Sequence, residues 1–172
     1  MPELIPILSR DRIQELVSGM ATRISHDYRN GDLVLIAVLK GAFIFLADLM
    51  RALTIPVCID FVQISSYGTG IDSSEKPFLK KGVDADIRSK DVLIIEDIVD
   101  TGLTMAFLID YIGTLGPRTI KTCAFLDKWE RRKVEIRLDY VCQKVESGFL
   151  VGYGLDYDES YRALPEIYRL TV

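Results

Sequence analysis

The segment DVLIIEDIVDTGLTM, residues 91–105, constrains the fold more than any other part of the chain. Residues 92–95 are an uninterrupted run of branched apolar side chains, which is typical of a parallel strand buried on both faces. The apolar residues that follow position 102 recur at helical spacing. The segment therefore predicts a strand, a loop and a helix in succession, with Glu96, Asp97 and residues 100–104 in the loop. In open α/β sheets, ligands bind at this carboxyl end of a strand.

The predicted loop combines two kinds of chemistry. Glu96 and Asp97 would repel a phosphate, but adjacent carboxylates suit vicinal sugar hydroxyls or Mg²⁺. Residues 100–104 open the predicted helix, whose free N–H groups suit a phosphate monoester, and Gly102 lets the backbone approach closely. A phosphate beside a diol is the pattern of a ribose 5-phosphate, so the loop predicts a site for a phosphorylated pentose.

The rest of the chain extends this alternation of strands and helices. We expect a capped amphipathic helix over 9–29, a strand and an apolar helix over 33–53, and strands over 57–65 and 119–128. The polar stretch between the strands at 57–65 and 92–95 predicts either disorder or a working lid, with FLKKGV extended inside it.

Four predicted strands end in polar side chains, at Lys40, Ser66, Glu96 and Lys128. In a parallel sheet these ends share one edge, where a single ligand could contact them all. At 172 residues the chain is predicted to be one α/β domain over residues 1–172. It would have a central, mostly parallel sheet flanked by helices, and a small hood built from the C-terminal strands, to which the N-terminus could add.

Composition excludes several classes of function. A net charge of −4 provides no basic field, so we expect no nucleic-acid partner. No apolar run approaches the roughly 20 residues of a membrane helix, and the N-terminus lacks the pattern of a secretory signal. The cysteines, Cys58, Cys123 and Cys142, have no paired metal-binding spacing. Reduced thiols in a cytoplasmic protein are therefore the expectation.

Residues 92–104, VLIIEDIVDTGLT, resemble the phosphoribosyl diphosphate signature of the type I phosphoribosyltransferases. The segments LKG (39–41), SSYGTG (65–70), LDK (126–128) and GFLVGYGLDYDESYR (148–162) resemble, in the same order, those of the hypoxanthine and hypoxanthine-guanine members. The resemblance covers nearly the whole chain. It implies the type I phosphoribosyltransferase fold and an enzyme of pentosyl transfer.

The same resemblance implies a reaction of purine salvage. It is the Mg²⁺-dependent transfer of the phosphoribosyl group from 5-phosphoribosyl 1-diphosphate to N9 of hypoxanthine, and also of guanine, giving IMP or GMP and diphosphate. Mg²⁺ is the implied cofactor, and a homodimer or homotetramer is the implied assembly. Two alternatives stay open: a xanthine-preferring relative, and a nucleotide-sensing RNA-binding regulator of the same fold.

The roles of individual residues also follow from the resemblance. Asp100 would be catalytic and would exchange the proton at N7 of the purine. The ribose 5-phosphate would be bound by Glu96, Asp97, Ile98, Val99, Asp100, Thr101, Gly102, Leu103 and Thr104. The diphosphate would be bound by Lys40, Gly41, Arg132 and Arg162, and the purine by Lys128, Phe149, Leu150 and Asp156. Ser66 and Tyr67 would belong to a lid, and Glu96, Asp97 and Asp156 would serve the metal. The family also has a cis peptide bond in the loop that contains Lys40.

The chemistry of two of these residues can be weighed directly. Lys128 donates hydrogen bonds and accepts none, so it would favour a carbonyl at position 6 of the purine over the amino group of adenine. Arg132 equally fits a solvated charged stretch, ERRKVEIR. The chain departs from the family pattern at residues 141–148, VCQKVESG where relatives carry a segment like VGFEIPDE, and at Trp129. The first departure puts the approach to the stacking Phe149 in doubt.

Two further features concern surfaces. The helix expected after Gly41 carries Phe43, Phe45 and Leu46 on more than one face, which favours burial of the remainder by a neighbouring subunit. The one histidine, His26, is placed in the last turn of the first helix, away from every motif, and no catalytic role is expected for it.

Overall fold

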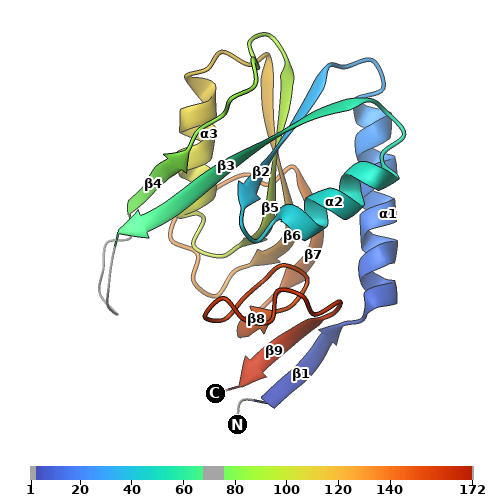
Figure 1. Ribbon diagram of the computed structural model, residues 1–172, viewed down its shortest axis with the longest axis vertical. Helices are drawn as coiled ribbons and strands as arrows, with labels where there is room; N and C mark the ends of the chain where they lie inside the picture. The colour runs from blue at the N-terminus through green and yellow to red at the C-terminus, as the bar shows by residue number, and fades with distance from the viewer. Residues whose placement is uncertain (1–2, 68–75, 172) are drawn as a thin grey trace.

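The computed structural model describes residues 3–67 and 76–171 (Figure 1). Its elements in chain order are β1 (Glu3–Leu8), α1 (Arg10–Asp27), β2 (Leu33–Leu39), α2 (Phe43–Ala52), β3 (Val57–Tyr67), β4 (Lys76–Lys81), β5 (Asp91–Val99), α3 (Leu103–Gly113), β6 (Thr119–Lys128), β7 (Tyr140–Val145), β8 (Phe149–Val151) and β9 (Ile167–Thr171). The predicted alternation of strands and helices is therefore confirmed. Among the described helices, none combines the length and apolar character that crossing a membrane demands.

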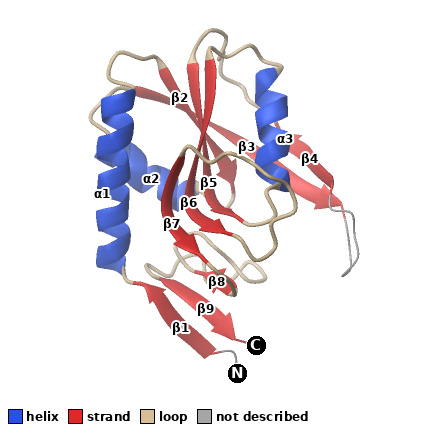
Figure 2. Cartoon of the chain, turned by 180° about the vertical axis from the view of Figure 1, so that it is seen from behind, coloured by secondary structure: helices blue, strands red, loops and turns tan. Residues whose placement is uncertain are grey.

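The main sheet has the strand order β4-β3-β2-β5-β6-β7 over the described residues. The five strands from β3 to β7 in this order run parallel, and β4 joins the edge antiparallel to β3. Helices α1 and α2 cover one face and α3 covers the other (Figure 2). The prediction of a mostly parallel sheet flanked by helices is confirmed.

The alternation of side chains along β2 explains why both faces are covered. Leu33, Leu35 and Ala37 pack in the core with α1 and α2, whereas Val34 and Ile36 pack in the core with α3. All five side chains are buried. A strand that is apolar on both faces needs a layer on each side, which fixes the three-layer arrangement.

Strand β5 is longer than the sequence predicts. It extends to Val99 because the parallel pairing with β6 continues past the two acids, with Glu96 opposite Ala124 and Val99 opposite Asp127. The placement of Glu96 and Asp97 in a loop was therefore wrong. Both residues belong to the carboxyl end of the strand, within its last residues that pair with β6. This pairing holds them more rigidly than a loop would.

A second sheet of order β1-β9-β8 lies beyond the carboxyl edge of the main sheet and brings both chain ends together (Figure 1). Glu3 of β1 pairs with Thr171 of β9, and Leu150 of β8 pairs with Arg169 of β9. This is the predicted hood, and the N-terminal strand contributes to it.

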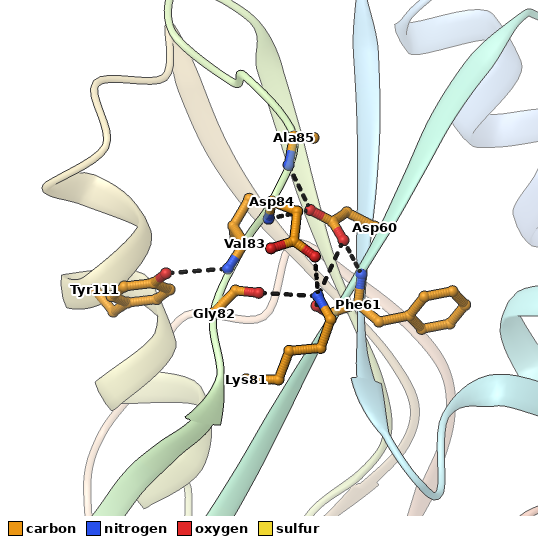
Figure 3. Close-up of polar contacts among 8 residues, drawn as sticks. All are labelled: Asp60, Phe61, Lys81, Gly82, Val83, Asp84, Ala85 and Tyr111. Atoms are coloured by element: carbon orange, nitrogen blue, oxygen red, sulfur yellow. Dashed lines mark hydrogen bonds and ion pairs between the residues drawn. The ribbon is translucent and has the colours of Figure 1, made fainter.

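The segment after β4 is fastened to β3 by a buried carboxylate (Figure 3). Asp60 of β3 accepts hydrogen bonds from the N–H groups of Phe61, Asp84 and Ala85 at 2.7 to 2.8 Å. Burial opposes the ionisation of Asp60, but these donors and the nearby Lys81 outweigh it and hold its pKa below the ordinary value. We call this arrangement the Asp60 clasp.

The Asp60 clasp is also connected to α3, which covers the same face of the sheet. The hydroxyl of Tyr111 on α3 accepts a hydrogen bond of 3.0 Å from the N–H of Val83 (Figure 3). Lys81 donates to the carbonyl oxygens of Phe61 and Gly82. The segment 82–85 is thus tied to β3 and α3 together, which fixes the direction in which β3 and β4 extend.

Helix α1 begins and ends as predicted. The side chain of Ser9 caps it by accepting a hydrogen bond of 3.2 Å from the N–H of Arg12, and His26 lies in its last turn. In helix α2, Phe45 and Leu46 are buried within this chain, so burial by a neighbouring subunit stays a prediction for the remaining apolar surface only. Phe43 stays 44% exposed.

Gly19 lies in the middle of α1, where its replacement by alanine is predicted to stabilise the protein. A Cβ built on Gly19 meets nothing within 4 Å, and the residue is exposed. A Gly19→Ala chain should therefore gain about 1 kcal/mol of unfolding free energy, since glycine costs that much in a helix interior. Thermal unfolding should show a rise in Tm of about 2–4 °C. An unchanged or lower Tm would mean that α1 does not continue through this position.

Candidate active site

A cavity of about 310 Å³ opens at the carboxyl ends of β2, β3 and β5. Its lining consists of Val38, Leu39, Lys40, Gly41, Ile64, Ser66, Glu96, Asp97, Ile98, Val99, Asp100, Thr101, Gly102, Thr104, Met105, Asp156 and Arg162. Three of the four predicted strand-end residues, Lys40, Ser66 and Glu96, meet here. Lys128 does not line the cavity, but its Nζ lies 3.4 Å from the Oδ2 of Asp100, which does.

Glu96 and Asp97 form an acidic pair in the cavity wall. Burial, together with the charge of Asp97, raises the pKa of Glu96 well above its ordinary value. Burial also raises the pKa of Asp97, although hydrogen bonds from Glu96 and from the N–H of Ile98 oppose this. An acidic pair with raised pKa values is stabilised by hydroxyl donors or by a cation beside it. The donor set therefore fits sugar hydroxyls and a hard divalent ion.

The turn from β5 to α3 occupies only residues 100–102. Gly102 caps α3 in the left-handed conformation, with φ of 84°, which a residue with a side chain adopts at a cost. Thr101 accepts a hydrogen bond of 3.3 Å from the N–H of Leu103 through its hydroxyl. Further N–H groups at the start of a helix lack intrahelical partners, and Thr101, Gly102 and Thr104 line the cavity. Leu103 is the one predicted residue of the 96–104 set that does not.

Asp100 has two chemically different carboxylate oxygens. Its Oδ2 lies 3.4 Å from the Nζ of Lys128 and 3.7 Å from the Nη1 of Arg131. Its Oδ1 is buried and has no hydrogen-bond partner among the described residues. A buried acceptor without a partner costs free energy, so a ligand that donates a hydrogen bond there is favoured. Arg131 was not anticipated from the sequence.

The loop after β2 is packed tightly against Asp97. The peptide bond between Leu39 and Lys40 is cis, as the resemblance implies. A Cβ on Gly41 would overlap the carboxylate of Asp97, and a Cβ on Gly154 would overlap the carbonyl oxygen of Gly41. Glycine is thus required at both positions for the backbone to approach the acidic pair.

Arg162 and Asp156 enter the cavity from the C-terminal segment. The Nη2 of Arg162 lies 2.9 Å from Asp156 and 3.5 Å from Glu159, and its Nη1 donates to the carbonyl oxygen of Gly154 at 2.7 Å. Glu159 also pairs with Lys40 at 2.8 Å. The hydrogen bond from Lys40 lowers the pKa of Glu159. Glu159 was missed from the sequence, where it is one acid among several in DYDES.

No protein metal site is complete in this arrangement. Within residues 3–67 and 76–171, no three side chains of the metal-ligating kinds come together. Asp156 is paired with Arg162 rather than with Glu96 or Asp97. A divalent ion at this cavity would therefore need oxygen atoms from a bound substrate or water to complete its coordination.

The predicted purine-binding and lid residues surround the cavity without lining it, except Asp156 and Ser66. Phe149 is 47% exposed and contacts the ring of Tyr157 edge-on, with centroids 5.4 Å apart. Leu150 is buried in β8. Tyr67 ends β3, and the rest of the predicted lid segment, 68–70, lies outside the described residues.

Arg132 does not take the place predicted for it. It does not line the cavity, and its side chain is only 11% exposed, so the alternative of a solvated charge fails as well. Its guanidinium is engaged by Asp127 and by main-chain carbonyl oxygens, and the ring of Trp129 lies 4.8 Å from it. Two of these acceptors, the carbonyl oxygens of Val99 and Asp100, lie more than 30 residues away in the chain, so no local pattern indicates them.

Comparison with known proteins places this geometry in a family. The family described as "Phosphoribosyl transferase domain" matches residues 7–158. The chain is 47% identical over 163 residues to the hypoxanthine-guanine phosphoribosyltransferase of Aquifex aeolicus, covering 94% of this chain and 92% of that protein. It is 37% identical to the hypoxanthine phosphoribosyltransferase of Salmonella typhimurium, covering 90% and 88%. A crystal structure of a hypoxanthine-guanine phosphoribosyltransferase from Bacillus anthracis superposes with a TM-score of 0.92 at 41% identity, covering 99% of this chain and all of that one.

Proposed function

The chain belongs to the type I phosphoribosyltransferase family, and on that premise we propose that it makes IMP from hypoxanthine and 5-phosphoribosyl 1-diphosphate. It is a transferase enzyme of the hypoxanthine and hypoxanthine-guanine group, whose reaction serves purine salvage. The phosphoribosyl group would pass to N9 of the purine, and guanine would be a second acceptor that gives GMP. Diphosphate would be the other product.

One observation carries the proposal. The acidic pair of β5 and the N-terminus of α3 border the same cavity, and only residues 98–102 separate them in the chain. Glu96 and Asp97 would accept hydrogen bonds from the ribose hydroxyls. The N–H groups of residues 100–104 would bind the 5-phosphate. Because both groups border one cavity, a single ribose 5-phosphate would contact them both.

The remaining steps follow from the groups around the cavity. Loss of diphosphate would leave an oxocarbenium ion at C1 of the ribose, which N9 of the base then attacks. The buried Oδ1 of Asp100 would accept the proton at N7. Lys128, which is 8% exposed, would donate to the oxygen at position 6. Lys40, Gly41 and Arg162 would contact the diphosphate.

A divalent cation fits the donor set of the cavity. Glu96 and Asp97 have raised pKa values, and Asp156 also lines the cavity, so Mg²⁺ would be held by these carboxylates and by the substrates. Bound Mg²⁺ would neutralise the negative charge of the departing diphosphate. The protein side chains position the reacting atoms, which is the larger part of catalysis of this kind.

Three further parts of the proposal concern the surroundings of the site. Ser66 and Tyr67 would belong to a lid that keeps water from the oxocarbenium ion, and Phe149 and Leu150 would contact the base. Phe43 and Met50, both exposed on α2, suit burial in a homodimer or homotetramer. The place of action would be the cytoplasm.

A panel of purines tests the proposed function. The purified chain with Mg²⁺ and 5-phosphoribosyl 1-diphosphate should convert hypoxanthine and guanine, with adenine at least about 100-fold slower in kcat/KM, because Lys128 offers a donor where adenine presents another donor. Nucleotide formation is measured for each of the four bases. Preference for xanthine would identify the xanthine-preferring relative. The absence of turnover with every base would favour a regulator, and turnover of adenine alone would contradict the role of Lys128.

A further inference from the structure

The carbonyl groups of the turn after β5 point away from the cavity. The carbonyl oxygen of Asp100 accepts a hydrogen bond of 2.9 Å from the Nε of Arg132, and that of Val99 accepts one of 3.3 Å from its Nη2. The carbonyl oxygen of Thr101 accepts from the N–H groups of Lys133 and Val134 at 2.9 and 3.3 Å. Three successive carbonyl groups are thus bound by one segment, 132–134, and no residue of that segment lines the cavity.

The orientation of these three carbonyl groups also fixes the direction of the N–H groups in the same peptide units. In a trans peptide unit the carbonyl of one residue and the N–H of the next point in opposite directions. The N–H groups of Asp100, Thr101 and Gly102 are therefore turned away from segment 132–134, and these three residues line the cavity. An array of N–H groups aimed at one point forms an anion site.

Arg132 is the side chain that holds two of the three peptide units. Its guanidinium also donates to the carbonyl oxygen of Lys128 at 3.1 Å and pairs with the carboxylate of Asp127, which is 4% exposed. The ring of Trp129 covers it at 4.8 Å. Arg132 therefore links the end of β5 to the end of β6. A lysine has one nitrogen and lacks the planar fork needed to bind these acceptors together.

We infer that Arg132 is a positioning residue, which orients the N–H groups of Asp100 and Thr101 toward a bound phosphate without touching it. The inference rests on the proposed function, because it assigns the phosphate of the ribose 5-phosphate to this turn. It replaces the direct contact with diphosphate that the resemblance implied for Arg132.

The test compares three variants for binding of ribose 5-phosphate, measured by calorimetry without base. Arg132→Lys keeps the charge but loses the fork, and should raise the Kd by about tenfold or more, the equivalent of one charge-assisted hydrogen bond. Arg137→Lys is the matched control, since Arg137 lies in the same loop between β6 and β7, has a side chain that is 89% exposed, and does not line the cavity. Its Kd should match that of the wild-type chain.

A double variant separates positioning from stability. Arg132→Met/Asp127→Leu replaces the buried pair by apolar side chains, which is often neutral or stabilising. It leaves no unpaired charge, but it removes the donors to three main-chain carbonyl oxygens, so its Tm should fall by a few degrees while the chain stays folded at the assay temperature. It should bind ribose 5-phosphate as weakly as Arg132→Lys. A double variant that binds with the wild-type Kd would overturn the inference. It would mean that Arg132 only neutralises the charge of Asp127 and does not orient the N–H groups of the turn. If Arg132→Lys fails to fold, the Kd of the double variant for ribose 5-phosphate alone tests the inference.

Activity provides a second, independent measurement. In the active chain, Arg132→Lys should raise the KM for 5-phosphoribosyl 1-diphosphate more than it lowers kcat, because the change acts on the phosphate site. Equal Kd values for the wild type and both Arg132 variants would overturn the inference while the wild type still converts hypoxanthine. A wild type that binds ribose 5-phosphate more tightly than the Arg132 variants but converts no base would instead overturn the proposed function alone.

Discussion

Replacement of Asp100 by asparagine is expected to lower kcat by about 10²–10⁴-fold, the usual contribution of a general acid or base. Asparagine has the same shape, so the turn from β5 to α3 should keep its geometry. It cannot take up the proton from N7, however, and the buried position of Oδ1 would become either a neutral carbonyl oxygen or an amide donor. Arg131 would lose the ion pair with Asp100, and Lys128 would keep only its ion pair with Glu130.

Rapid-quench measurement of a single turnover with hypoxanthine would separate the chemical step from product release. The KM for 5-phosphoribosyl 1-diphosphate should stay close to the wild-type value, since in the proposed function backbone groups and the acidic pair would hold the sugar phosphate. Asp110→Asn is a matched control, because Asp110 is exposed on α3 and does not line the cavity. If the chemical step of Asp100→Asn is as fast as that of the control, Asp100 has no part in proton transfer.

The second large effect is expected for Gly41→Ala. The new Cβ would overlap the carboxylate of Asp97, so either the carboxylate or the loop after β2 must move. A displacement of about 1 Å at a reacting centre costs about 100-fold in rate. We expect kcat/KM for 5-phosphoribosyl 1-diphosphate to fall at least that far, because in the proposed function Asp97 would bind the ribose hydroxyls and the loop at Gly41 would bind the diphosphate.

Gly19→Ala is the control for Gly41→Ala. It makes the same chemical change on α1, where a Cβ meets nothing within 4 Å, so its kinetic constants should equal those of the wild type. Steady-state kinetics with varied donor and saturating hypoxanthine would compare the two variants. Wild-type kcat/KM in Gly41→Ala would mean that the tight packing of Gly41 on Asp97 has no role in binding the donor.

The parts of the fold that were predictable depend on local periodicity. The strand at 33–39 and the helix capped by Ser9 carry their patterns within one segment, and both were placed to within two residues. The extent of β5 could not be predicted in this way. Its last residues, through Val99, are held by pairing with β6, and that pairing joins segments that are distant in sequence.

The residues of the candidate site also divide into those that local sequence predicts and those that only the folded chain reveals. Glu96, Asp97 and the turn at 100–104 were found because their chemistry is contiguous in the chain. Arg132 and Glu159 were misplaced or missed because their partners are backbone carbonyl groups or side chains that only the folded chain brings near. A charged residue in a polar stretch looks the same in sequence whether it is solvated or buried.

The hood has a consequence for how a nascent chain matures on the ribosome. Strand β9, Ile167–Thr171, lies between β1 and β8, so the strand that joins the other two is synthesised after both of them. The main sheet and the turn after β5 consist entirely of earlier residues. We expect a growing chain to assemble its main sheet first, while β1 has no partner strand until β9 emerges.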